Sequence, residues 1–209
     1  ENTLIPRGDT ENIVEEVIAT IENSGYNTVL DMCTGTGAIA ISVAHYTKAK
    51  VTASDISSKA LEVARENAKI LNADVNFIES DLFENINETF DVLVSNPPYI
   101  ESEVIPTLME QVKDYEPMLA LDGGKDGLDF YRNIINQAKN YINQNGCIVF
   151  EIGYNQGGQV KSLLENAGFV NINVKQDLAG LDRLVIGFKL WYTDHIRTGG
   201  KKCLKDLQI

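Results

Sequence analysis

The stretch TVLDMCTGTGAIAISVAHY, residues 28–46, joins a short apolar run to a helix-like segment through a glycine turn. The run TVLDM has the length and apolar content of a buried strand, and AIAISVAHY has those of a buried helix. Glycine at such a junction lets the backbone turn tightly and lets a ligand approach it closely. The helix that follows presents N–H groups without intrahelical partners. The stretch therefore predicts a strand, a turn over Gly35-Thr36-Gly37 and a helix, with room for a ligand at the turn.

The alternation of strand and helix patterns continues outward on both sides of this unit. Strands separated by single helices favour a parallel sheet with helices on both faces. No helix separates the last two strands, so one of them is expected to run antiparallel. We therefore predict an α/β fold, a doubly wound, mostly parallel seven-stranded sheet with an antiparallel C-terminal hairpin. The predicted strands are 28–32, 50–55, 75–80, 90–95, 147–153, 170–176 and 183–190; the predicted helices run from Asp9 or Thr10 to Ser24, over 38–46, from Ser57 or Ser58 to Asn72, and over about 104–113, 127–142 and about 156–166, with a turn at Asn145-Gly146.

The composition is that of a globular protein with an acidic surface. The 209 residues suit one domain, which we place over residues 1–189, with a C-terminal tail of unclear structure over 190–209. A formal net charge of -12 disfavours a nucleic-acid partner. Three cysteines without metal-ligand spacing predict reduced thiols in a cytoplasmic protein, with no metal site. No apolar run is long enough for a membrane span, and we expect a monomer.

Two carboxylates frame the glycine turn and indicate what it binds. Gly35-x-Gly37-x-x-Ala40 fits a dinucleotide fingerprint, but such a match alone is weak, and a turn without a ligand remains an alternative. Asp55 ends the second strand about 20 residues past the glycines, where a carboxylate can accept both hydroxyls of a ribose. Asp31, just before the turn, would repel a pyrophosphate but suits a cofactor with a cationic centre and a free ammonium. S-adenosylmethionine (S-adenosyl-L-methionine) has both groups, so we predict it as the cofactor.

The end of the third predicted strand adds two more candidates. Asp81 and Leu82 follow that strand in the stretch ESDLF. Parallel strands bring their carboxyl ends to one edge of the sheet, so both residues are expected to flank the adenine of the cofactor. An ordinary polar strand end explains them equally well.

The stretch VLVSNPPYIES, residues 92–102, ends the fourth strand on two prolines. Neither proline has an N–H, so strand pairing stops there. The side-chain oxygen of Asn96 and the carbonyl of Pro97 then form two rigid acceptors, which match the two hydrogens of an –NH2 group. The ring of Tyr99 can cover the planar group that bears it. Fixed acceptors orient an amide or amino nitrogen and favour the pyramidal geometry of attack, whereas a plain Asn-Pro turn is the structural alternative.

Several of these stretches resemble known methyltransferases. The set Asp31, Gly35, Gly37 and Asp55 resembles the Rossmann-like S-adenosylmethionine-dependent methyltransferases, and Asn-Pro-Pro-Tyr resembles the amino methyltransferases that act on adenine, cytosine or glutamine. Four further stretches resemble the protein-(glutamine-N5) methyltransferases of peptide-chain release factors, and the resemblance covers about residues 3–189. They are LIPRGDTE, ALDGGKDGLDFYR, FEIGYNQGGQV and DLAGLDRLVIG.

The resemblance to the release-factor enzymes implies a reaction, a partner and a set of site residues. It implies methyl transfer to the glutamine of the Gly-Gly-Gln loop of a release factor, with Asn96, Pro97 and Tyr99 as catalytic residues. It also implies that the family's helical N-terminal domain is absent from this chain. Arg7 would lie near the substrate entry, although Gly8 stands where the family usually has proline. The implied cofactor contacts are Cys33, Thr34, Gly35, Thr36, Gly37, Asp55, Leu82 and Asn96, and the implied amide-binding residues are Asn96, Pro97, Pro98 and Tyr99.

Two other functions remain open from the sequence. A methyltransferase for exocyclic amines of nucleic-acid bases would use the same Asn-Pro-Pro-Tyr stretch, but the acidic balance counts against it. A cofactor-binding module without catalysis would serve as an interaction domain, although the cofactor and amide-binding stretches are both intact.

Overall fold

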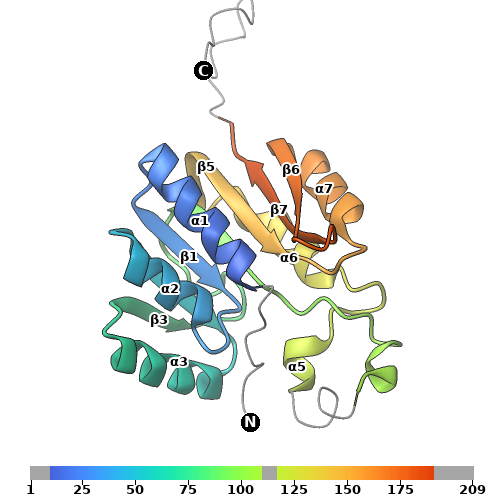
Figure 1. Cartoon of the computed structure of the whole chain (residues 1–209), viewed down its shortest axis with the longest axis horizontal. Coiled ribbons are helices and arrows are strands. Elements are labelled where there is room, and N and C mark those ends of the chain that lie inside the picture. Colours follow the sequence, from blue (N-terminus) through green and yellow to red (C-terminus); the bar gives the residue numbers. More distant parts are fainter. Residues whose placement is uncertain (1–9, 110–116, 191–209) are drawn as a thin grey trace, which may run out of the picture.

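A seven-stranded sheet forms the centre of the molecule (Figure 1). The structure, a computed structural model, describes residues 10–109 and 117–190. The strands are β1 (Thr28–Met32), β2 (Lys50–Asp55), β3 (Val75–Glu79), β4 (Phe90–Ser95), β5 (Ile142–Glu151), β6 (Val170–Gln176) and β7 (Asp182–Phe188). The helices are α1 (Thr10–Ser24), α2 (Ala38–Tyr46), α3 (Ser58–Leu71), the 3-10 turn η1 (Ile105–Thr107), α5 (Met118–Leu121), α6 (Asp129–Ala138) and α7 (Gly157–Asn166).

The strand order confirms the predicted fold class. It is β3-β2-β1-β4-β5-β7-β6, and neighbouring strands are parallel except in the two pairs that include β7. The order reverses between β1 and β4, where an open α/β sheet forms its ligand crevice. The doubly wound sheet and the antiparallel C-terminal hairpin are therefore both present.

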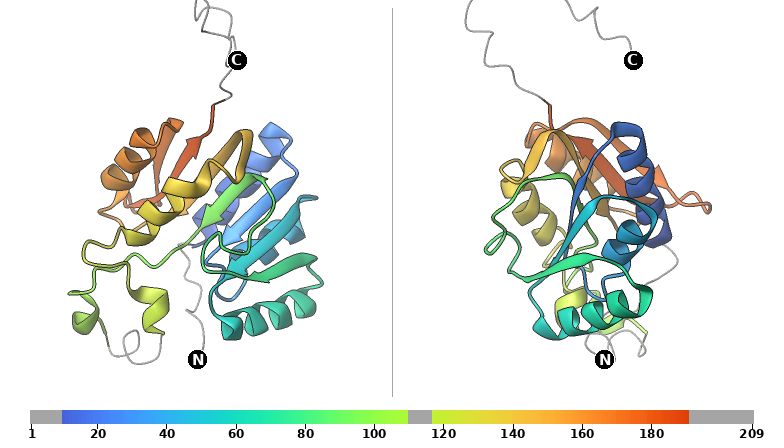
Figure 2. Two further views of the ribbon diagram at one scale, coloured as in Figure 1. Left: turned by 180° about the vertical axis from the view of Figure 1, so that it is seen from behind. Right: turned by 90° about the vertical axis from the view of Figure 1, so that its left-hand side faces the viewer.

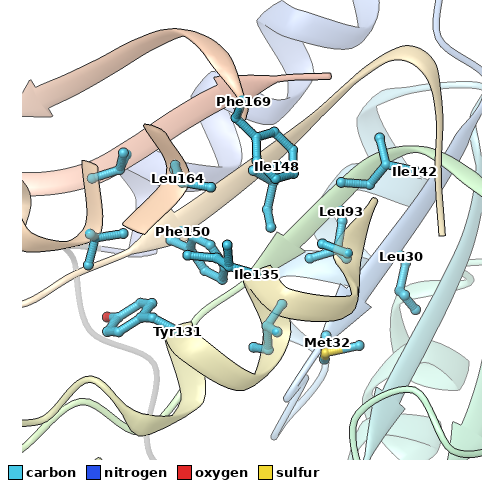
Figure 3. Packing of buried hydrophobic residues seen from close by; sticks show 14 of the residues in the cluster. Leu30, Met32, Leu93, Tyr131, Ile135, Ile142, Ile148, Phe150, Leu164 and Phe169 are labelled. Carbon is cyan, nitrogen blue, oxygen red and sulfur yellow. The ribbon is translucent and has the colours of Figure 1, made fainter. Parts of the chain in front are cut away.

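The central strands bury both of their faces, because successive side chains point to opposite sides of the sheet. Val92 and Val149 belong to the core under α1 and α2. Leu93 and Ile148 belong to the core under α6 and α7, which Figure 3 shows from close by. The two helix pairs cover opposite faces, and α3 lies beside α2 (Figure 2). All four of these side chains are completely buried, so the sheet is a rigid frame for the loops at its edge.

The first and third helices follow the expected sequence signals. Helix α1 begins and ends as predicted and buries one apolar stripe through Ile13, Val17 and Ile21. Ser57 caps α3, because its side chain accepts a hydrogen bond of 3.2 Å from the Ala60 N–H. Within the described ranges, none of the helices has the length and hydrophobicity needed to cross a bilayer.

Helix α6 ends earlier than predicted. We expected a helix over 127–142, but α6 ends at Ala138 and β5 begins at Ile142. Between them, the Tyr141 N–H donates to the Ala138 carbonyl (3.0 Å), and the Tyr141 carbonyl accepts from the Phe90 N–H (2.8 Å). Pairing with β4 therefore replaces the last helical turn, and the helix-like pattern of those residues is overridden by the sheet.

The Asn145-Gly146 pair is a bulge inside β5, not the predicted turn between elements. The pairing register of β5 with β4 shifts at this point, and Asn145 has left-handed backbone with φ of 63°. Gly146 lies so close to β4 that an added Cβ would be 2.5 Å from the Asp91 carbonyl oxygen. Left-handed backbone at an asparagine occurs in bulges and in hairpin turns alike, so the Asn-Gly pair itself does not distinguish them.

The described residues 104–109 and 117–121 also differ from the prediction. The described part of the expected helix at about 104–113 contains the short 3-10 turn η1, and Leu108 after it is extended. Residues 110–113 of that prediction lie outside the described residues. Helix α5 was not predicted, because four residues are too few to produce a helical period.

Strand β6 forms one edge of the sheet and is irregular. Its register with β7 shifts twice, and Asn171 within it has left-handed backbone with φ of 49°. Asn173 and Lys175 are exposed.

We predict that Gly146→Ala destabilises the fold, because the new methyl group would overlap the Asp91 carbonyl oxygen at 2.5 Å. Overpacking of this kind commonly costs ~1–3 kcal/mol. Chemical denaturation of the two chains measures the loss.

Gly158→Ala is the matched control, since no heavy atom lies within 4 Å of its added Cβ. Gly158 lies in the first turn of α7, where alanine is expected to be neutral or stabilising by up to about 1 kcal/mol. Equal stability of both variants would show that the bulge does not require glycine.

Candidate active site

Four strands end around one cavity of about 310 Å³. The loops that follow β1, β2, β3 and β4 all contribute to its wall, as expected for parallel strands that end at the same edge. Most of the predicted cofactor and substrate residues that the structure describes line it. They are Cys33, Thr34, Gly35, Thr36, Asp55, Asp81, Leu82, Asn96 and Pro98.

The glycine turn is held by hydrogen bonds to the neighbouring loops. Gly35 has left-handed backbone with φ of 56°, and its N–H donates to Oδ2 of Asp55 (2.9 Å). The Thr34 N–H donates to the Ser54 carbonyl (3.0 Å), and the Asn67 amide donates to the Thr36 carbonyl (3.0 Å). These bonds fix the turn before any ligand arrives.

Gly37 has a packing role that the sequence analysis did not assign. It precedes α2 with left-handed backbone, φ 80°. An added Cβ would lie 3.0 Å from Cδ1 of Ile41 and 3.1 Å from Cβ of Ala64. Gly37 therefore allows α2 and α3 to approach closely, and it is not among the residues that line the cavity.

Asp55 links two loops at the cavity. Its Oδ1 accepts from the Ser57 N–H (2.9 Å), and its Oδ2 accepts from the Gly35 N–H (2.9 Å). Each carboxylate oxygen has a further lone pair, which can accept from a ligand hydroxyl. Asp55 therefore lines the cavity with acceptors available for a ligand, and its contact with a ribose stays a prediction.

Asp31 lies beneath the turn and is completely buried. Its Oδ2 accepts from the Thr34 hydroxyl (2.6 Å) and from the Ala40 N–H (3.1 Å). Its Oδ1 is buried without a hydrogen-bond partner in the described structure. Burial raises the pKa of the Asp31 carboxyl to about 7, against the two hydrogen bonds, which lower it. A buried acceptor without a partner is costly unless a donor or a cation reaches it.

Cys33 and Leu82 both line the cavity with left-handed backbone, φ 61° and 46°. Burial raises the pKa of the Cys33 thiol well above its usual value, so the thiol stays protonated and is not a nucleophile. The Leu82 carbonyl accepts from the Ser80 hydroxyl (2.9 Å), which supports its backbone. Asp81 also lines the cavity and is exposed.

The Asn-Pro-Pro-Tyr segment is divided between the cavity and the core. Asn96 and Pro98 line the cavity, whereas Pro97 is buried outside the lining. Tyr99 is partly buried and packs against the core under α6, and it is not a lining residue. Arg7, predicted at the substrate entry, lies outside the described residues.

Sequence reasoning missed one wall of the cavity. That wall comes from α5 and the start of α6, which follow the irregular region after β4. Phe130 lies in the stretch ALDGGKDGLDFYR, so the family resemblance was the signal that could have indicated it. The missed residues of this wall are Pro117, Leu119, Ala120 and Phe130.

Comparison with known proteins identifies the family. Residues 14–124 match the family described as "Methyltransferase small domain". The release factor glutamine methyltransferase of Clostridium acetobutylicum is 46% identical over 195 residues, which is 90% of this chain and 68% of that protein. The chain belongs to the release factor glutamine methyltransferases. The Fusobacterium nucleatum member is 44% identical over 90% of this chain, which spans 54% of that protein.

Solved structures agree with this assignment. The protein-(glutamine-N5) methyltransferase (release factor-specific) of Alicyclobacillus acidocaldarius has a TM-score of 0.55 and 27% identity over 89% of this chain and 94% of that one. A ribosomal protein L11 methylase from Lactobacillus delbrueckii has a TM-score of 0.63 with 23% identity, over 88% of this chain and 81% of that one, and supports the fold alone.

Methyltransferases of this family use S-adenosylmethionine, and the residues present fit it. Asp31 is not among the residues that line the cavity, but its buried, unpartnered Oδ1 beneath the glycine turn is a candidate counter-charge for a cationic ligand. Asp55 offers carboxylate lone pairs beside a cavity of a suitable size for a small-molecule cofactor.

We predict that binding of S-adenosylmethionine releases a proton from Asp31. The carboxyl has a pKa of about 7 in the free chain, so at pH 6 it is mostly protonated. A cation near it favours the charged form and lowers the pKa, and a proton is then released. Calorimetry at pH 6 in buffers of different ionisation enthalpy measures the release, which Asp31→Asn should abolish.

The sign of the stability effect follows from the same pKa. Because the folded value lies above the unfolded one, this group's contribution to stability is present below about pH 4 and is lost as pH rises to about 7. Asp31→Asn should remove this pH dependence. Binding without proton release at pH 6 would contradict the placement of the cation beside Asp31.

Proposed function

We propose that this chain transfers a methyl group from S-adenosylmethionine to the side-chain amide nitrogen of the glutamine in the Gly-Gly-Gln loop of a peptide-chain release factor. The observation that carries the proposal is that Asn96 lines the same cavity as Asp55 and the glycine turn. The release factor glutamine methyltransferases at 46% and 44% identity support the substrate.

The oxygens of Asn96 and Pro97 counteract the low nucleophilicity of the amide nitrogen, which is the main chemical obstacle to transfer. An amide nitrogen is a poor nucleophile, because its lone pair is delocalised into the carbonyl. The Asn96 side-chain oxygen and the Pro97 carbonyl accept its two hydrogens and hold the nitrogen in one orientation. These bonds strengthen as the nitrogen becomes pyramidal and gains positive charge, so they act mainly in the transition state. The bound cofactor supplies the electrophilic methyl group.

The other site residues hold the cofactor. We assign the ribose hydroxyls to Asp55 and the cationic end of the cofactor to Asp31. Asp81 and Leu82 flank the adenine, since both line the cavity after β3. Arg7 stays a predicted residue of the substrate entry. In this arrangement the two carboxylates bind two different groups of one molecule, the ribose and the methionine part.

A nucleic-acid amine is the weaker alternative substrate. The net charge of -12 repels a phosphate backbone. We also propose that the chain acts as a monomer, without a nucleic-acid partner, in the cytoplasm, where its free Cys33 and Cys147 thiols would stay reduced.

Transfer of tritium-labelled methyl groups tests the proposed function. We expect label in a release factor, and we expect a release factor with Gly-Gly-Ala in place of Gly-Gly-Gln to remain unlabelled. A tRNA pool and duplex DNA serve as competing substrates. Label in nucleic acid with none in the release factor would overturn the proposal in favour of the base-modifying alternative.

Asn96→Ala should lower kcat by ~10²–10³, the usual loss when one preorganised electrostatic partner is removed. The dissociation constant for S-adenosylmethionine should change less than ~10-fold. Single-turnover transfer measures the first quantity and calorimetry the second. Asn87→Ala is the control, because Asn87 is exposed and its side chain donates only to the Asn85 carbonyl among the described residues.

Asn96→Asp is a sharper variant. It keeps an acceptor but adds a negative charge beside the cationic centre of the cofactor, which stabilises the charged ground state and opposes transfer. We expect cofactor binding at least as tight as in the parent, together with slow transfer. Parental rates in both Asn96 variants would remove Asn96 from the mechanism.

A further inference from the structure

The Asn-Pro-Pro-Tyr segment extends beyond the end of β4, and few backbone hydrogen bonds hold it in place. Ser95 is the last residue of β4, and Pro97 and Pro98 have no N–H to donate. Ile100 forms the next backbone pairs: its N–H donates to the Leu121 carbonyl (3.0 Å), and its carbonyl accepts from the Gly123 N–H (2.8 Å). The position of the amide-binding atoms therefore depends on how this far end is held.

A buried glutamine side chain, Gln156, is bonded to that far end. It is 5% exposed, and its Nε2 donates to the carbonyls of Tyr99 (3.0 Å) and Gly127 (3.2 Å). Its Oε1 accepts from the Gly153 N–H (2.9 Å). Rotating the amide would place oxygen against two carbonyls and nitrogen against an N–H, so one orientation alone is compatible with these partners.

Two glycines close the space around the Tyr99 peptide. An added Cβ on Gly127 would lie 2.4 Å from the Tyr99 carbonyl oxygen and 2.6 Å from Nε2 of Gln156. An added Cβ on Gly123 would lie 2.7 Å from Cα of Tyr99 and 2.9 Å from the Pro98 carbonyl oxygen. The peptide is thus enclosed on one side by backbone and tied on another by the glutamine.

We propose that Gln156 is a positioning residue for methyl transfer, fixing the Tyr99 peptide and, through it, the acceptors of Asn96 and Pro97. The inference rests on the proposed function. Gln156 is not among the residues that line the cavity, so it acts through the segment it holds.

The two prolines make the segment stiff enough to pass a displacement of the Tyr99 peptide on to the acceptors. Their ring-fixed φ angles leave few free torsions between Ser95, anchored in β4, and Tyr99. A shift of the Tyr99 peptide is therefore passed to the Pro97 carbonyl, because little of it can be absorbed in between. A misplacement of about 1 Å at a reacting group can lower a rate by ~10²-fold.

Gln156→Leu tests the inference, since leucine has a similar size and no hydrogen-bonding group. We expect kcat on a release factor to fall roughly 10–100-fold. The KM for the release factor and the dissociation constant for S-adenosylmethionine should change less than about 3-fold, because the loss arises in the transition state.

Asn143→Leu is the matched control. It also removes a side-chain amide, whose Nδ2 donates to Oδ1 of Asp91 (2.8 Å). That bond joins the starts of β5 and β4, at the end of the sheet away from the cavity. The control should lose stability, as measured by denaturation, and keep the parental kcat.

Gln156→Glu gives a readout that a merely structural role would not produce. Its carboxylate still accepts from the Gly153 N–H but has no donor for the Tyr99 and Gly127 carbonyls. Protonation restores one donor, so kcat relative to the parent should recover as pH is lowered. If Gln156→Leu does not fold, this pH profile decides the question.

The outcomes separate the two proposals. No transfer by the parent chain overturns the proposed function and this inference with it. Transfer by the parent, with kcat of Gln156→Leu within about 3-fold of it, overturns the inference alone. An equal kcat loss in Asn143→Leu, weaker cofactor binding in step with the kcat loss, or a Gln156→Glu profile parallel to the parent's would also overturn it.

Discussion

The hydrogen bond from the Gly35 N–H to the Asp55 carboxylate is the constraint on which the site depends. Left-handed backbone at Gly35 turns this N–H toward the end of β2, 2.9 Å from the carboxylate. The second oxygen of the same carboxylate accepts from Ser57, which caps α3. One side chain thereby joins the loops after β1 and β2. A cofactor that approaches this edge meets a wall that is already assembled, so little ordering remains to oppose binding.

The fold was predictable where burial dominates the sequence pattern. The central strands are buried on both faces, so each reads as a short apolar run bounded by turn residues. The end of α6 was not predictable in the same way, because residues with a helical pattern pair with β4 instead. The Asn145-Gly146 bulge has the same cause. Its left-handed backbone is a local property, but whether it makes a turn or a bulge depends on the strand opposite.

The candidate site, like the fold, has parts that the sequence predicts and parts that it does not. Residues at the ends of strands, such as Asp55 and Asn96, could be placed from topology alone, since parallel strands end together. The wall from α5 and α6 could not, because its path depends on tertiary contacts after an irregular segment. The stretches that resemble the family also contain residues that hold the site in place without lining the cavity. Gly123, Gly127 and Gln156 lie in them and contact the Tyr99 peptide, a role that motif matching did not reveal.

The irregular edge strand β6 has a consequence for the molecule in a crowded solution. A regular outer strand would present a straight ladder of unpaired N–H and C=O groups, and such a ladder can template sheet growth between molecules. The two register shifts and the left-handed Asn171 bend that ladder. The sheet can therefore remain open at this side and still resist joining its neighbours into aggregates.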